Sequence, residues 1–188
     1  MVWPWQRGRA DHRRRDTPGI GSAAGLSPSP ISDPKFVAGL RPIASGPLGP
    51  EAARAAADIT GTDVHGRGVE VNIGDFPGLL LLAFLHVHCD GCDEFWRGLR
   101  DETSLELPSA TSVIAMTKGP GDIDPAEVEH ASAGVSRVPV VMSDKAWIDY
   151  RVMGYPFFVV VDPSTRTIVA ETVGFGWSEV ISMVGSVG

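Results

Sequence analysis

The chain has 188 residues, 43% of them hydrophobic, which is enough for one domain with a substantial buried core. Its 16 basic and 23 acidic residues give a formal net charge of -7, which argues against a nucleic-acid binder. The two cysteines lie three positions apart, so they exclude a framework of disulfides between distant segments and indicate a local redox or metal pair.

The N-terminal segment, residues 1–58, is rich in Pro, Gly, Ser and Arg and shows no persistent helical or strand period. This composition predicts a largely disordered segment that contains one short Ala-rich helix, Glu51 to Ile59. The segment has neither the apolar centre of a secretory peptide nor a membrane-spanning run, so the expected location is cytoplasmic. A missing anchor or signal would instead place the chain outside the cytoplasm.

The folded domain is expected over residues 59–188, with a strand or hairpin within 62–73 at its start. The apolar run Leu79–Val87 is too short to span a bilayer and predicts a strand that is covered on both faces. Acidic residues and apolar residues at helical spacing follow, which indicates a helix that begins at or just after Cys89. The centre of the domain is therefore a strand, a Cys-x-x-Cys turn and a helix.

The rest of the domain alternates between short apolar runs and capped helical patterns. A strand at Thr111–Thr117 is expected to lie parallel to the first strand, because a helix connects the two. The later elements, in order, are a helix after Asp124 that reaches Ala133, an extended piece at 138–142, a helix at 145–152 capped by Asp144, a strand at 157–161, an antiparallel strand at 167–173 and a helix at 177–184.

This order of elements resembles that of the thioredoxin superfamily, and three separate places in the sequence carry the resemblance. They are Phe84 five residues before Cys89, the Tyr155-Pro156 pair before an apolar strand, and Val173-Gly174 before the last helix. The stretch between Gly119 and Val152 is similar to the insert of redoxins and TlpA-like thiol-disulfide reductases. The resemblance implies an α/β fold, namely a thioredoxin-like three-layer α/β/α domain with a mixed central sheet, a redoxin-type insert and a cis peptide bond before Pro156.

The Cys-x-x-Cys pair predicts thiol chemistry. Cys89 lies at the head of the helix, where unpaired backbone N–H groups and the helix dipole favour a thiolate nucleophile. Cys92, one turn inward, would resolve the mixed disulfide. His88 and Asp90 are predicted to tune the ionisation of the pair, and Tyr155 with Pro156 to bind an extended substrate beside it.

We therefore expect a thiol-disulfide oxidoreductase that acts on protein or small-molecule disulfides and is restored by an external thiol reductant, without a cofactor or a metal. Two alternatives remain open. His86 or His88 with the two cysteines would make a zinc or copper binding or delivery module. An interaction domain of low activity is the other alternative, because Ala83 stands where thioredoxins keep a buried carboxylate.

Overall fold

The computed structural model describes residues 46–49, 53–101 and 105–188, so most of the predicted N-terminal segment 1–58 lies outside the description. The strands are β1 (Gly46–Pro47), β2 (Arg54–Ala55), β3 (Ile59–Thr62), β4 (Gly68–Val71), β5 (Leu80–Phe84), β6 (Ser112–Thr117), β7 (Val140–Met142), β8 (Phe157–Asp162) and β9 (Thr167–Val173). The helices are α2 (Asp93–Arg100), α3 (Pro125–Ala131), α4 (Asp144–Asp149) and α5 (Trp177–Gly185), and two 3-10 turns are η2 (Ile73–Asp75) and η3 (Asp90–Cys92).

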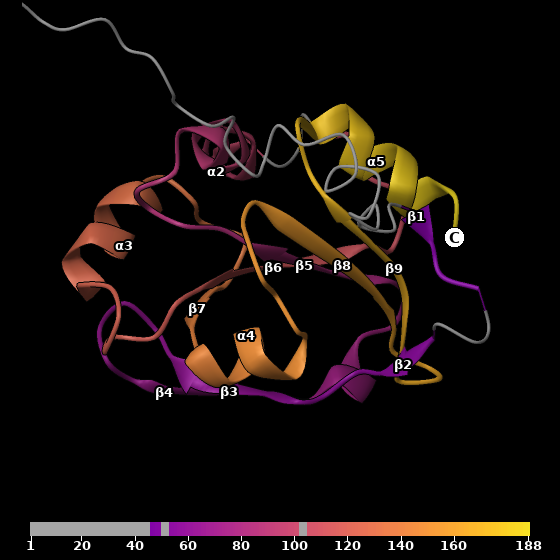
Figure 1. Ribbon diagram of the computed structural model, residues 1–188, viewed down its shortest axis with the longest axis horizontal. Coiled ribbons are helices and arrows are strands. Elements are labelled where there is room, and N and C mark those ends of the chain that lie inside the picture. The colour runs from indigo at the N-terminus through magenta and orange to yellow at the C-terminus, as the bar shows by residue number, and fades with distance from the viewer. Residues whose placement is uncertain (1–45, 50–52, 102–104) are drawn as a thin grey trace, which may run out of the picture. The chain divides into compact units, whose positions relative to one another are not determined.

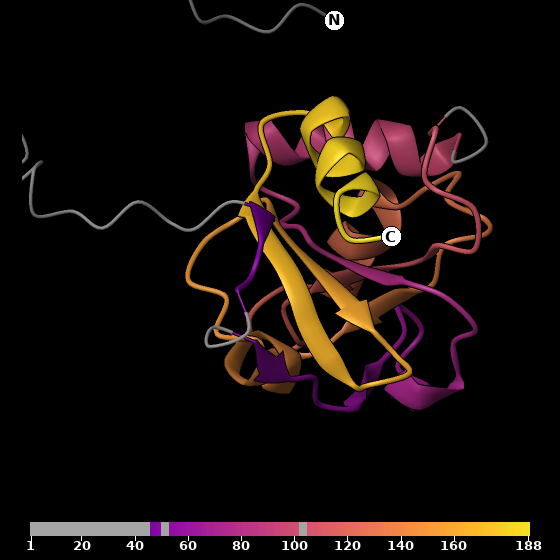
Figure 2. The same ribbon diagram turned by 90° about the vertical axis from the view of Figure 1, so that its right-hand side faces the viewer.

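The described strands form one nine-stranded sheet in the order β1-β9-β8-β5-β6-β7-β3-β4, with β2 also paired to β9. Figure 1 shows α2, α3 and α5 over one face of this sheet and α4 over the other, and Figure 2 shows the same layers from the side. The mixed sheet between two helical layers is the architecture that the sequence predicts. No helix in the described ranges is long and apolar enough to cross a membrane.

Strand β5 lies at the centre of the sheet, parallel to β6 and antiparallel to β8. All five of its residues are fully buried. Because side chains alternate along a strand, Leu80, Leu82 and Phe84 pack toward α4, while Leu81 and Ala83 pack toward α2 and α5. The expected central strand is therefore confirmed, and it delivers the chain to the cysteines between two apolar layers.

The edge strand β9 is covered by residues that the sequence assigns to the N-terminal segment. In β1, Gly46 pairs with Glu171, and in β2, Arg54 pairs with Ile168, while the Arg54 side chain also forms an ion pair with Glu171. The helix predicted over residues 51–59 is wrong where the chain is described. Alanine favours a helix, but a helix this short is marginal on its own, and pairing with the edge of β9 outweighs it. The described sheet begins before residue 59.

The predicted cap of α4 is also wrong by one residue. Ser143, not Asp144, is the N-cap, and its hydroxyl accepts a hydrogen bond from the Ala146 N–H at 3.0 Å. Asp144 instead accepts a hydrogen bond from the Gly119 N–H at 2.9 Å and so holds the loop that follows β6. The cap predicted for α3 is confirmed, since the Asp124 side chain accepts a hydrogen bond from the Ala126 N–H.

Candidate redox site

The two cysteines lie at the point where β5 gives way to a helix. Cys89 is the N-cap of η3, and the Cys92 N–H donates a hydrogen bond to the Cys89 carbonyl at 2.8 Å. The 3-10 turn continues directly into α2. The helix start predicted after Cys89 is confirmed, with its first turn wound more tightly than an α-helix. The first cysteine therefore lies at the N-terminal end of a continuous helical segment, and its side chain makes no capping hydrogen bond there.

The two thiols differ in exposure and in acidity. Both are free, Cys89 is half-buried and Cys92 is 0% exposed. The His86 N–H donates a hydrogen bond to the Cys92 sulfur at 3.4 Å. Burial, and then the hydrogen bond with Cys89, raise the pKa of Cys92 from 9.0 to about 12. Cys92 therefore keeps its proton at neutral pH, and Cys89 is the thiol that solvent reaches.

Tyr155 and Pro156 lie beside this turn. The peptide bond between them is cis, as the resemblance implies, and Pro156 is buried. A β-carbon placed on Gly91 would be 3.7 Å from the Cys89 sulfur and 3.7 Å from the Pro156 Cδ atom. The sulfur and the proline ring therefore both lie within van der Waals contact of the space beside Gly91. The Tyr155 side chain is 43% exposed, so one flank of the site presents an aromatic ring to solvent.

A row of rings and one cation continues from this flank, and sequence reasoning did not predict it. The His86 ring stacks on Tyr155 with centroids 4.4 Å apart. Tyr155 meets the edge of Trp147 at 6.0 Å, and the Lys118 ammonium lies 4.9 Å from the centre of the Trp147 ring. The four residues come from four separate parts of the chain, so no local pattern brings them together. The one available signal is that Lys118 follows the carboxyl end of a parallel strand, where ligand sites gather.

The two histidines near the cysteines have different surroundings. Burial, with the charges of His88 and Lys118, lowers the pKa of His86, whose Nδ1 atom accepts a hydrogen bond from the His88 N–H at 3.1 Å. His88 is exposed, and its Nε2 atom lies 3.3 Å from the carboxylate of Glu127 on α3. His86 is therefore held neutral at neutral pH. Asp90 is exposed, and its carbonyl accepts a hydrogen bond from the Asp93 N–H.

Two open pockets border the site, one beside α3 and the other between α2 and α3. One has a volume of about 350 Å³ and is lined by His88, Glu127 and His130, among others. The other, of about 270 Å³, shares His130 and adds Arg97 and Arg100. Across the described ranges, no group of three or more His, Cys, Asp or Glu side chains is arranged to hold a metal ion. The site therefore consists of two free thiols with open pockets nearby.

No protein-family model matches the sequence, and no curated protein does. Solved structures match the fold. A thiol:disulfide interchange protein from Chlorobium tepidum is 15% identical, with a TM-score of 0.53 over 71% of this chain and 96% of that one. A secreted Mycobacterium tuberculosis disulfide oxidoreductase is 16% identical, with a TM-score of 0.51 over 68% of this chain and 94% of that one.

The third structure is that of BsSco, a member of the Sco family of cytochrome c oxidase assembly proteins. It is 13% identical, with a TM-score of 0.51 over 76% of this chain and 96% of that one. The three likenesses agree on one architecture, and the chain therefore has the thioredoxin-like fold. The resemblance predicted from the sequence is confirmed at this level, and the Cys-x-x-Cys pair lies at the head of a helix in this fold.

Proposed function

We propose that the chain is a thiol-disulfide oxidoreductase in which Cys89 is the nucleophile and Cys92 the resolving thiol. One observation carries the proposal: a half-buried thiol lies at the head of a helical turn, with a fully buried thiol one turn inward. The first position leaves the sulfur open to solvent, so a substrate disulfide can reach it. The second keeps a protonated thiol out of reach until a mixed disulfide has formed.

The reaction transfers two electrons to the substrate. The Cys89 thiolate attacks one sulfur of the substrate disulfide, the S–S bond breaks, and the other substrate sulfur leaves as a thiolate. Cys92 then attacks Cys89, and its proton passes to the departing thiolate. The Cys89–Cys92 disulfide forms and the reduced substrate is released. An external thiol reductant supplies two electrons and two protons to restore the pair, so no metal or organic cofactor enters the reaction.

The substrate is a disulfide-containing protein or peptide, in our proposal, and it contacts Tyr155 and Pro156. The support is their position, since Pro156 packs beside Gly91 and Tyr155 offers an exposed ring on the same side. An extended segment bound there would hold its disulfide against Cys89. His88 and Asp90, both exposed within one residue of Cys89, are the proposed tuning residues. The proposed location is the cytoplasm, and an extracytoplasmic location is the alternative.

A redox titration of the full chain tests the function. The chain is equilibrated in thiol-disulfide buffers of different potential, the free thiols are trapped by alkylation, and the mass shift is read. We expect one reversible transition that involves both thiols and disappears in Cys89→Ser and in Cys92→Ser. If both thiols stay reduced at every potential, or resist alkylation until a chelator is added, the oxidoreductase proposal is wrong.

Substitution of Tyr155 tests the substrate contact. We expect Tyr155→Ala to lower kcat/KM for a peptide disulfide roughly fivefold, because an aromatic contact is worth about 1 kcal/mol. Met153→Ala is the matched control, since Met153 lies two positions earlier and is 95% exposed. Equal rates for the two variants would remove Tyr155 from the substrate site, while the redox titration would still report on the thiols.

A further inference from the structure

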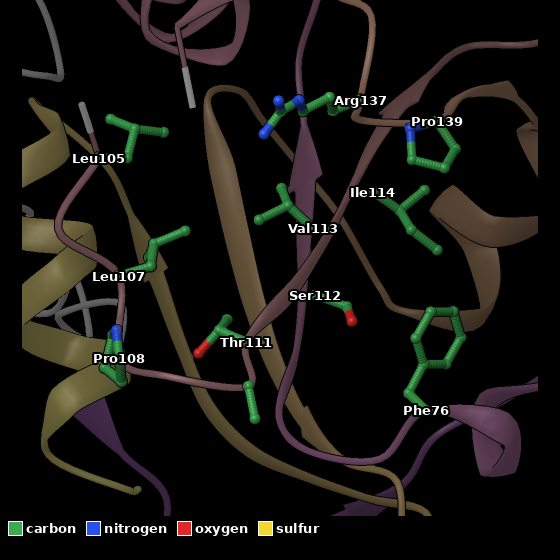
Figure 3. A pocket seen from close by; sticks show the side chains of 11 residues that line it. Phe76, Leu105, Leu107, Pro108, Thr111, Ser112, Val113, Ile114, Arg137 and Pro139 are labelled. Carbon is green, nitrogen blue, oxygen red and sulfur yellow. The ribbon is translucent and has the colours of Figure 1, made fainter. Parts of the chain in front are cut away.

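A third pocket lies away from the cysteines, at the beginning of β6 (Figure 3). Its volume is about 440 Å³. The residues that line it come from the turn after η2, from β6 and the loop that enters it, and from the loop that enters β7. Ser112, the first residue of β6, pairs with Leu80, the first residue of β5. Since the cysteines follow the other end of β5, the length of that strand, roughly 16 Å, separates the pocket from the redox site.

On the side that faces β7, the backbone of β6 has no partner at Val113 among the described residues. The Ala115 N–H donates a hydrogen bond to the Pro139 carbonyl at 2.9 Å, and the β6–β7 ladder starts at Ala115. Because backbone groups alternate in direction along a strand, the N–H and C=O of Val113 face the same side as those of Ala115. Proline has no N–H to donate, and among the described residues no backbone group pairs with the Val113 N–H. The sheet thus has a one-residue opening between β6 and β7.

The side chains around this opening offer further unused groups. The Thr111 hydroxyl oxygen is buried and has no hydrogen-bond partner in the described structure. Arg137 is the one charged residue among the eleven that line the pocket, and it forms no ion pair with another described residue. Figure 3 shows its guanidinium directed away from Pro139, toward the side of the pocket that carries Leu105. Apolar walls are supplied by Leu105, Leu107 and Phe76.

We propose that this pocket binds an extended peptide segment of a partner protein by strand addition at Val113. The segment carries an acidic side chain that pairs with Arg137 and an apolar side chain that fills the pocket. A small carboxylate would also suit Arg137, but it has no N–H to offer the Val113 carbonyl. An extended peptide supplies both a donor and an acceptor, and a further backbone N–H for the Thr111 hydroxyl. Binding here is independent of the thiols and goes beyond the proposed function.

Peptide titration tests the proposal on the full, reduced chain. The probes are fluorescein-labelled, end-blocked hexapeptides. Valine occupies alternating positions, and each peptide carries glutamate at a different one of the remaining positions. Binding is measured by fluorescence anisotropy. We expect saturable binding of at least one of them. The same peptide with lysine in place of glutamate should bind at least tenfold more weakly. So should a copy with N-methylated backbone, which cannot pair with a strand edge.

Two variants assign the binding to this pocket. Arg137→Glu should weaken binding of the glutamate peptide at least tenfold and strengthen binding of the lysine peptide. The control is Arg151→Glu, at an exposed arginine that lines none of the pockets described, and it should change neither. Thr111→Val keeps the side-chain shape but removes an unpaired hydroxyl, so we expect it to raise the melting temperature of the free chain and weaken the peptide. The proposal is wrong if no hexapeptide binds saturably to the folded chain, or if binding is unaffected by N-methylation or by the charge reversal at Arg137.

Discussion

Replacing Gly98 by alanine is expected to lower the free energy of unfolding by about 3 kcal/mol, at the upper end of the usual cost of overpacking a core. Gly98 lies within α2, where a β-carbon would be 2.0 Å from the Nε1 atom of Trp177 on α5. The indole cannot swing aside easily, because its ring packs against Phe95 at 5.3 Å and Phe158 at 5.8 Å. The overlap would push α2 and α5 apart over the face of the sheet that carries Cys92.

Gly185→Ala is the matched control for this prediction. Gly185 is the last residue of α5, and a β-carbon there would have no atom within 4 Å. Helix propensity alone predicts that alanine stabilises both sites by up to about 1 kcal/mol. Urea unfolding of the two variants therefore distinguishes the cost of the steric overlap at Trp177 from the gain in helix propensity. A Gly98→Ala chain that is as stable as the parent would show that the two helices do not pack as described.

The reduced chain is expected to lose stability as the pH rises above about 9, and Cys92 is the reason. Its pKa is raised from 9.0 to about 12 in the folded state, chiefly by burial. Above pH 9 the unfolded chain releases this proton while the folded chain keeps it. The stabilisation is complete below pH 9 and is lost as the pH rises toward 12, by about 1.4 kcal/mol for each pH unit.

Unfolding in urea at pH 7 and pH 10.5, in a phosphine reductant, measures this loss. Cys92→Ser has no thiol to titrate, so its decline should be smaller than that of the parent by about 2 kcal/mol. Burial also raises the pKa of Tyr150, but this contribution is present in both chains and cancels in the comparison. If the free energy of unfolding falls equally in the parent and in Cys92→Ser, the pKa of Cys92 is not raised by folding.

Local patterns predict most of the domain from Leu79 onward. The apolar run of β5, the acidic first turn of α2 and the Asp124 cap each lie within a few residues of the structure that they specify. The turn between β8 and β9 is of the same kind, because the Asp162 carboxylate accepts a hydrogen bond from the Ser164 N–H two positions later. Such short-range hydrogen bonds leave a direct trace in the sequence.

Features that depend on distant partners were not predictable in this way. The pairing of β2 with β9 brings Arg54 to Glu171, 117 positions apart in the sequence. The alanines around β2 favour a helix when the sequence is read alone, because β9 is distant in the chain. Ser143 and Asp144 are equally good caps, and only the contact of Asp144 with Gly119 decides between them. At the site, the spacing of the cysteines indicates the chemistry, whereas the ring row beside them needs the folded chain.

The pairing of β1 and β2 with β9 also bears on how the molecule behaves in concentrated solution. The described residues 46–49 and 53–56 lie along β9. The Leu48 N–H donates a hydrogen bond to β9 and the Ala56 N–H donates one to the turn before it, each of 2.8 Å. A chain that began at residue 59 would leave the seven residues of β9 with a bare outer edge. Such an edge is a template for another molecule's strand. By covering this edge, the short stretch should oppose self-association, although it adds little to the hydrophobic core.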